Sequence, residues 1–246
     1  MRVAADLFRC MVSPILGRQE RRFMSVLVFD LDGTLVSSGE DLVATTNAVL
    51  TSAGYAAAPA DQLIKLAGHG AKALLRGGLD ASATPWTDDL IEPLFHQFLD
   101  HYEIHMTDQT RPYPGAVSAL SQLQEQGWRL AVCTNKSERL THPLLDRLDL
   151  SRFFSSVVAG DTFAVSKPKA EPVLGAISRA GGKSEGSIMI GDTATDINAA
   201  RAAGIPVIAV DFGYTPVPVT ELAPDRIISH FDELIGAVAE LSANVA

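Results

Sequence analysis

The stretch VLVFDLDGTL (26–35) decides the fold of this chain. Its four apolar residues at 26–29 have the length and composition of a strand buried in a parallel sheet. They run directly into Asp30 and Asp32, and Gly33 follows, where the backbone can turn sharply. An acidic turn explains Asp32 with Gly33, but not a second aspartate at the strand end. Because ligands of open parallel sheets bind beyond the carboxyl ends of the strands, both carboxylates are candidate functional residues.

From residue 24 onward, short apolar runs alternate with helical periods, which is typical of βα units around a parallel sheet. The further strands that we expect are 130–133, 156–159, 188–190, 207–210 and 226–228. The helices that we expect between and after them are 116–126, 138–148, 170–180, 194–203 and 232–241. The pattern predicts the α/β fold class.

Residues 38–108 interrupt this alternation, because they contain no clear strand and have helical periods. Ser38 and Asp41 form a plausible capping pair for the first of these helices, which would end before Gly54. A helical insert between the first strand and the rest of a βα chain predicts a small cap domain at 38–108. The catalytic core would then be discontinuous and consist of 24–37 and 109–246.

A second acidic pair follows the fourth expected strand, in GDTATD (191–196). Asp192 lies at the strand end and Asp196 lies four residues later. Acidic residues near a helix start can simply complement the helix dipole, but two carboxylates at this spacing share a face and repel each other. A divalent cation that prefers oxygen ligands would remove that conflict. Taken alone, the segment fits a helix cap and a metal site about equally well.

Two further segments place polar groups after strands of the expected sheet. Thr134 and Asn135 follow the second strand, and Lys167 lies in a loop after the third. Each residue alone is an ordinary loop residue. Together they supply the donors and the fixed positive charge that a phosphoryl group needs beside several carboxylates.

Composition and charge exclude several function classes. The net charge of −9 and the isoelectric point near 5.1 argue against nucleic acid or an anionic membrane as the main partner. No apolar run approaches the ~18 residues of a membrane span. Two cysteines cannot form a disulfide framework, so we expect a reducing compartment, the cytoplasm.

The first 23 residues differ from the rest, because five arginines against Asp6 and Glu20 give them a net charge of +3. They contain acidic residues and few serines, whereas transit peptides are rich in serine and poor in acidic residues. Met24 stands immediately before the first strand. We therefore expect residues 1–23 to be a dispensable N-terminal extension.

The four motifs together resemble those of haloacid dehalogenase-like hydrolases. These motifs are DLDGTL (30–35), Thr134-Asn135, Lys167-Pro168 and GDTATD (191–196), in this order. The resemblance implies a Rossmann-like core with a small helical cap inserted after the first motif. Within this superfamily, GHGAKALLRGGL (68–79) and VDFGYTPVPVTEL (210–222) resemble segments of bacterial phosphoglycolate phosphatases.

The resemblance also implies a mechanism. Asp30 would attack phosphorus and form an aspartyl-phosphate, and Asp32 would act as general acid and then as general base. Asp30, the backbone carbonyl of Asp32 and Asp192 would hold Mg²⁺. An aspartate at position 32 favours phosphate ester hydrolysis over dehalogenation, because an alkoxide leaving group needs a proton.

The remaining motif residues would support the phosphoryl group. Thr134 and Asn135 would bind its oxygens, and Lys167 would neutralise its charge. Asp196 would orient Lys167 or a metal-bound water.

The substrate implied is a small phosphorylated metabolite, with 2-phosphoglycolate first. In the cap, Gly68, His69 and Lys72 are candidate substrate-binding residues, although Lys72 and Arg76 also suit a solvated helix face. A sugar phosphate, a nucleoside monophosphate and pyrophosphate are alternative substrates, and a phosphomutase is an alternative enzyme. A phospho-acceptor signalling module is a distant alternative, since it places its acceptor aspartate later in the sheet and has no cap. The sequence does not indicate an oligomeric state.

Overall fold

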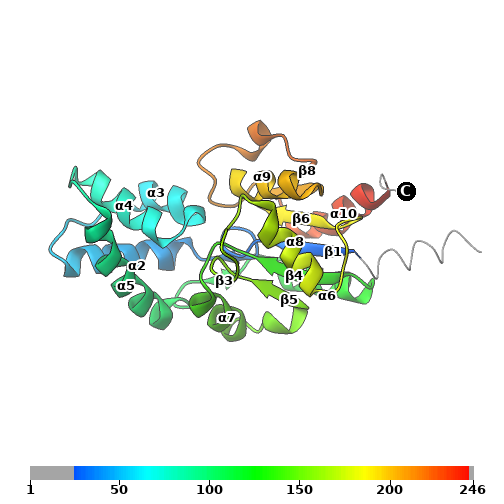
Figure 1. Ribbon diagram of the computed structural model, residues 1–246, viewed down its shortest axis with the longest axis horizontal. Coiled ribbons are helices and arrows are strands. Elements are labelled where there is room, and N and C mark those ends of the chain that lie inside the picture. The colour runs from blue at the N-terminus through cyan, green and yellow to red at the C-terminus, as the bar shows by residue number, and fades with distance from the viewer. Residues whose placement is uncertain (1–24, 244–246) are drawn as a thin grey trace, which may run out of the picture.

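The computed structural model describes residues 25–243, which form a six-stranded parallel sheet flanked by helices and a group of helices inserted after the first strand (Figure 1). The expected extension at 1–23 lies outside the described residues. The α/β class with a helical insert is thereby confirmed. No helix among residues 25–243 is long and apolar enough to cross a membrane.

Strand β1 (Val26–Phe29) lies at the centre of the sheet, between β4 (Arg129–Cys133) and β6 (Ile188–Gly191). Phe29 pairs with Val132 on one side and with Ile190 on the other, all in parallel. The full order is β5-β4-β1-β6-β7-β8, in which the outer strands are β5 (Ser156–Val158), β7 (Val207–Val210) and β8 (Arg226–Ile228). The ends of β1, β4 and β6 therefore meet at one edge, and each is followed by a predicted motif.

The alternating side chains of β1 divide between two apolar layers, because successive residues of a strand point to opposite faces. Leu27 and Phe29 belong to one layer, whereas Val26 and Val28 belong to the other. The first layer is covered by α6 (Ala116–Glu125), α7 (Glu138–Arg147) and α10 (Leu234–Ala243). The second is covered by α8 (Ala170–Arg179) and α9 (Ala194–Ala203). A strand buried on both faces explains why its sequence is continuously apolar.

The insert leaves the core through β2 (Val36–Ser37) and returns through β3 (Arg111–Pro112), and these two short strands pair antiparallel. It consists of α2 (Gly39–Ser52), α3 (Ala60–Leu63), the short 3₁₀ helix η1 (Ile64–His69), α4 (Ala71–Ala81) and α5 (Asp88–His105). These helices gather to one side of the sheet (Figure 1). Their buried side chains, such as Leu50, Leu74 and Phe98, continue the first apolar layer. Further short 3₁₀ helices are η2 (Ser151–Phe153), η3 (Val219–Leu222) and η4 (Phe231–Glu233).

The predicted capping pair of Ser38 and Asp41 is wrong. Ser38 lies at the start of α2 but makes no side-chain capping bond, because its hydroxyl donates to Oδ1 of Asp32 at 2.5 Å. The carboxylate of Asp41 accepts hydrogen bonds from the backbone of Gln109 and from the backbone and hydroxyl of Thr110. Both side chains thus bind partners in or beside the segments that connect the insert to the sheet.

Candidate active site

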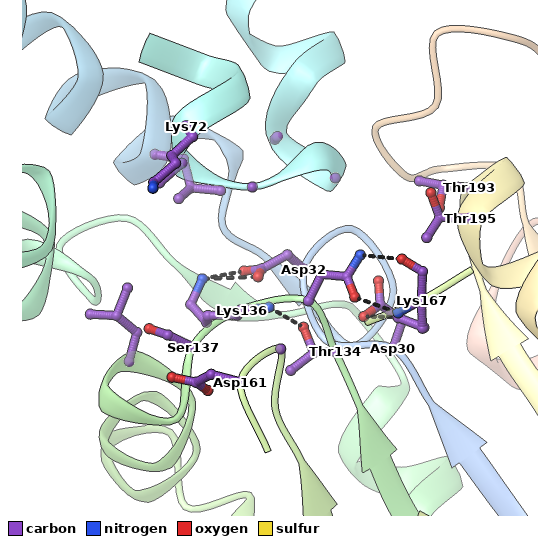
Figure 2. A pocket seen from close by; sticks show the side chains of 18 of the residues that line it. Asp30, Asp32, Lys72, Thr134, Lys136, Ser137, Asp161, Lys167, Thr193 and Thr195 are labelled. Carbon is purple, nitrogen blue, oxygen red and sulfur yellow. Dashed lines mark hydrogen bonds and ion pairs between the residues drawn. The ribbon is translucent and has the colours of Figure 1, made fainter. Parts of the chain in front are cut away.

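A cavity of about 370 Å³ lies between the ends of the central strands and the inserted helices (Figure 2). The core contributes residues from every predicted motif, and the insert contributes residues from η1, α4 and α5. The lining includes Asp30, Asp32, Gly68, Lys72, Thr134, Asn135, Lys136, Ser137, Lys167, Thr193 and Asp196.

Asp30 is the first residue after β1, and its amide donates to the carbonyl of Ile190 on the neighbouring strand at 2.9 Å. This bond holds the aspartate at the sheet edge. Its Oδ1 accepts a hydrogen bond from Nζ of Lys167 at 2.8 Å. Burial raises the pKa of Asp30 to about 7, with repulsion from Asp196 adding to the rise and Lys167 opposing it. In the absence of a cation, this carboxylate therefore holds a proton far more readily than an exposed aspartate.

Asp32 forms an ion pair that the sequence did not predict. Nζ of Lys136 lies 2.9 Å from both of its carboxylate oxygens, and both side chains are buried. Nζ also lies 3.4 Å from the hydroxyl of Tyr102 and 4.7 Å from the centre of its ring. Burial alone would lower the pKa of Lys136, but Asp32 and Tyr102 raise it above its usual value. Lys136 is therefore positively charged at neutral pH.

The only sequence signal for Lys136 is its position directly after Thr134-Asn135. Its partner Asp32 is 104 residues away, and Tyr102 belongs to helix α5 of the insert. Local patterns cannot pair residues at such distances. Lys136 meets Asp32 because β1 and β4, which precede these two residues, are neighbouring strands of the sheet.

Asp192 follows the last residue of β6 and is completely buried. Thr34 donates to its Oδ1 at 3.0 Å, and the amide of Tyr214 donates to its Oδ2 at 2.8 Å. Gly33 and Gly213 pack against this carboxylate. A Cβ atom added to Gly33 would lie 2.4 Å from Oδ2 of Asp192, and one added to Gly213 would lie 2.3 Å from it, so both positions require glycine. Burial, together with Asp196 and Asp30, raises the pKa of Asp192 well above its usual value.

Asp196 and Lys167 form a second buried ion pair, with Nζ 2.6 Å from Oδ1. The other oxygen, Oδ2, accepts hydrogen bonds from the amide and hydroxyl of Thr193 in a capping box at the start of α9. Burial alone would lower the pKa of Lys167, but Asp196 and Asp30 raise it above its usual value. Asp196 thus positions Lys167 between two carboxylates.

Thr134 and Asn135 both line the cavity, but they differ in whether their side chains are free to bind a ligand. Oγ1 of Thr134 accepts from the amide of Lys136 at 3.1 Å, which leaves its hydroxyl hydrogen free to donate. The amide group of Asn135 contacts the backbone of Lys167 twice, at 3.1 Å each. The structure therefore ties Asn135 to the loop that carries Lys167.

The three predicted substrate-binding residues of the cap differ in their position relative to the cavity. Gly68 lies against the core, where a Cβ atom would come within 2.9 Å of the Thr193 side chain. His69 is the last residue of η1 and is not among the described residues that line the cavity. Lys72 faces the cluster of core residues across the cavity (Figure 2). Its Nζ lies 2.5 Å from Glu92 and 4.8 Å from the ring centre of Phe95.

A divalent cation fits this arrangement of carboxylates. One oxygen from each of Asp30, Asp192 and Asp196 lies within 4.8 Å of the others, and all three residues are buried. Lys167 lies against two of these carboxylates, those of Asp30 and Asp196, whereas the hydroxyl and the amide that donate to Asp192 are neutral. Hard cations such as Mg²⁺ prefer such carboxylate oxygens. Asp196 is paired with the ammonium group of Lys167 through Oδ1 and caps α9 through Oδ2, whereas Asp192 accepts only from neutral donors among residues 25–243 and has no cation to offset its charge. Asp192, together with Asp30, is therefore the better ligand.

Comparison with known proteins identifies the family. The model of the haloacid dehalogenase-like hydrolase family matches residues 27–210, which is more than half of the chain. The chain is 44% identical over 220 residues to a phosphoglycolate phosphatase of Agrobacterium fabrum, and the match covers 89% of this chain and 94% of that protein. It is 39% identical over 207 residues to a phosphoglycolate phosphatase of Caulobacter vibrioides, with 84% and 87% covered.

A solved structure shares the fold. The crystal structure of a protein described as a predicted phosphoglycolate phosphatase from Haemophilus somnus 129PT matches with a TM-score of 0.81 at 28% identity. The match covers 87% of this chain and 98% of that one. The ordered motifs, the sheet with its helical insert and these similarities lead to one conclusion: the chain belongs to the haloacid dehalogenase-like hydrolase family.

Proposed function

We propose that this chain is a Mg²⁺-dependent phosphatase that hydrolyses 2-phosphoglycolate to glycolate and phosphate. The observation that carries the proposal is one cavity whose wall holds the buried side chains of Asp30, Asp32 and Lys167, with buried Asp192 nearby. The relatives named phosphoglycolate phosphatase support the choice of substrate. A reducing, cytoplasmic location remains our prediction.

Asp30 is the nucleophile in this proposal. One of its oxygens forms a bond to phosphorus while the bond between phosphorus and the leaving oxygen breaks, which gives an aspartyl-phosphate. Lys167, 2.8 Å from Asp30, neutralises the phosphoryl oxygens as they approach the carboxylate. The free hydroxyl hydrogen of Thr134 donates to one of these oxygens.

Asp32 transfers the protons. For this step Asp32 must be protonated, whereas the ion pair with Lys136 holds it as a carboxylate; the carboxylic acid then gives its proton to the leaving oxygen, so that glycolate leaves as an alcohol. The resulting carboxylate then takes a proton from water as the water oxygen attacks phosphorus, which frees Asp30 and releases phosphate. Ser38 and Lys136 hold this side chain at the cavity wall.

Asp30, the backbone carbonyl of Asp32 and Asp192 would hold the Mg²⁺ ion. When bound, the ion supplies positive charge that offsets the repulsion between the nucleophile and the phosphate. Thr34 and the amide of Tyr214 orient Asp192 for this role. Asp196 holds Lys167 in place.

We further propose that the helices at 38–108 act as a cap on a core formed by 24–37 and 109–246. The contact between Gly68 and Thr193 brings η1 directly against the loop that follows β6. A cap in this position excludes bulk water from the cavity and limits the substrate to a small molecule. Gly68 would allow the close approach, while substrate binding by Asn135, His69 and Lys72 stays a prediction.

A screen of small phosphate monoesters with measured release of inorganic phosphate tests the proposal. We expect the highest kcat/KM for 2-phosphoglycolate and loss of turnover on removal of Mg²⁺. The variant Asp30→Asn should lose turnover by at least about 1000-fold, because its amide is a poor nucleophile. Asp89→Asn on the exposed surface of α5 is the matched control.

A clear preference for a sugar phosphate, a nucleoside monophosphate or pyrophosphate would contradict the substrate. Transfer of the phosphoryl group to a second sugar hydroxyl, without release of phosphate, would indicate a phosphomutase. Stable phosphorylation of Asp30 without turnover would indicate a phospho-acceptor module.

A further inference from the structure

We propose that Lys136 binds the carboxylate of the substrate and thereby selects 2-phosphoglycolate over esters that lack this group. The inference rests on the proposed function and assigns the substrate-recognising cation. It places that cation in the core, beside Asp32, instead of in the cap.

The covalent structure of the substrate determines where the cation must be. In 2-phosphoglycolate a single methylene carbon joins the leaving oxygen to the carboxylate, so these oxygens are only about 3 Å apart. Asp32 must reach the leaving oxygen to protonate it. The carboxylate must therefore lie close to Asp32, and Nζ of Lys136 is 2.9 Å from both oxygens of Asp32.

The other two lysines of the cavity are less suitable. Lys167 is bound to Asp30 and Asp196 at the end of the cavity where phosphorus reacts. Lys72 already has the carboxylate of Glu92 at 2.5 Å, and its side chain is 41% exposed. An exposed and paired charge is screened by water and contributes little to binding a further carboxylate. Lys136 is buried, with a side-chain exposure of 5%.

Substrate binding also frees a donor hydrogen of Lys136. Its ammonium group has three donor hydrogens, and its contacts are the two oxygens of Asp32 and the hydroxyl of Tyr102. When Asp32 turns one oxygen toward the leaving oxygen, Lys136 loses one acceptor. The substrate carboxylate replaces it without leaving a buried cation underbonded.

A neighbouring hydroxyl supports the same position. Oγ of Ser137 is buried and has no hydrogen-bond partner within the described part of the chain, and Ser137 lines the cavity next to Lys136 (Figure 2). A hydroxyl here can donate to the second oxygen of a carboxylate held by Lys136. The acidic neighbour Asp161 is turned to the start of α7, where its Oδ1 accepts from the amide of Glu138 at 2.7 Å.

The experiment compares 2-phosphoglycolate with 2-hydroxyethyl phosphate, which has a similar size and no carboxylate. In the wild type we expect a large kcat/KM ratio in favour of 2-phosphoglycolate. Lys136→Met should reduce that ratio by about 100-fold, the effect of one lost hydrogen bond to a charged group. Lys136→Arg should retain part of the preference because it keeps the charge. Lys72→Met tests the rival cation of the cap and should leave the ratio unchanged. The matched control is Lys65→Met, at an exposed lysine of η1 that does not line the cavity.

Three results would overturn the inference. If Lys136→Met lowers kcat/KM equally for both esters, Lys136 acts only by positioning Asp32. If Lys72→Met abolishes the preference, the cap lysine recognises the carboxylate. If the wild type does not prefer 2-phosphoglycolate, the proposed function fails, and the inference fails with it. The first two results leave the proposed function intact.

A second measurement covers the case in which Lys136→Met does not fold because Asp32 is left unpaired. Asp32→Asn removes the charge of the partner, so Asp32→Asn/Lys136→Met contains no unpaired charge at this position. Addition of 2-phosphoglycolate should raise the Tm of Asp32→Asn and have much less effect on the double variant. Inorganic phosphate should raise the Tm of both equally. Equal stabilisation by 2-phosphoglycolate would contradict a role of Lys136 in binding.

Discussion

The carboxylate of Asp196 joins two parts of the site, because one oxygen lies 2.6 Å from Nζ of Lys167 while the other accepts hydrogen bonds from Thr193 at the start of α9. Asp196→Asn keeps an oxygen that can accept from Thr193 but removes the charge that faces Lys167. We expect kcat to fall by about 10- to 100-fold, as is typical when a group that orients a catalytic residue is lost. Steady-state kinetics would check this.

The matched control for this change is Asp89→Asn in the exposed first turn of α5. We expect its kcat to equal that of the wild type. An Asp196→Asn enzyme with unchanged kcat and a reduced Tm would mean that Asp196 serves only the stability of the helix start.

The glycines around Asp192 predict a separate effect on metal binding. At Gly213 a Cβ atom would lie 2.3 Å from both Cβ and Oδ2 of Asp192, so Gly213→Ala must displace this carboxylate. We expect the affinity for Mg²⁺, measured by calorimetry, to fall by about 10- to 100-fold. Gly236→Ala in α10 is the control, because nothing lies within 4 Å of the added Cβ. Alanine is about 0.5–1 kcal/mol more favourable than glycine inside a helix, so this variant should fold and bind Mg²⁺ like the wild type. Wild-type affinity in Gly213→Ala would exclude Asp192 as a ligand.

The sequence predicted the sheet closely, because its strands are continuous apolar runs bounded by polar turns. The strand expected at 188–190 is observed at Ile188–Gly191, and the one expected at 130–133 begins one residue earlier. The structure also brings Asp30, Thr134 and Asp192 to one edge, since β4 and β6 flank β1. Strand order is set by packing between distant segments, which local periodicity does not encode.

The contacts between the insert and the core could not be predicted for the same reason. Tyr102 reaches Lys136 because α5 packs against α7, and nothing in the periodicity of either helix specifies that register. The Ser38–Asp41 spacing suited a capping pair, but buried partners elsewhere competed successfully for both side chains. Ser38 shows that a local motif predicts a structure only when no distant partner offers a stronger bond.

Mg²⁺ should stabilise the protein more at high pH than at low pH. In the metal-free fold Asp30 keeps its proton up to a pKa of about 7, whereas the unfolded chain releases it near 3.8. The folded state therefore binds more protons in this window, and Asp30 makes the fold less stable as the pH rises from about 4 to about 7. A cation must displace that proton at low pH but not at high pH. We expect a larger rise in Tm with Mg²⁺ at pH 8 than at pH 5.

Differential scanning fluorimetry at fixed Mg²⁺ would measure this difference. Asp192→Asn should reduce the rise in Tm caused by Mg²⁺ at both pH values, because it removes a ligand. Asp89→Asn should show the same rise as the wild type. An equal rise in Tm at pH 5 and pH 8 would show that no carboxylate proton competes with the ion.

The carboxylate of Asp41 predicts how firmly the insert is attached to the core. It is buried at the start of α2 and binds the backbone of Gln109 and Thr110, so it connects the outgoing segment to the returning one. Asp41→Asn replaces one acceptor oxygen by an amide that faces these donors. We expect the free energy of unfolding, measured in urea, to fall by about 1.5–3 kcal/mol, and cleavage by a protease between the insert and β3 to accelerate. Asp61→Asn, at an exposed residue of α3, should change neither the free energy of unfolding nor the rate of cleavage. Unchanged stability in Asp41→Asn would mean that the antiparallel pair of β2 and β3 holds the two segments together without this carboxylate.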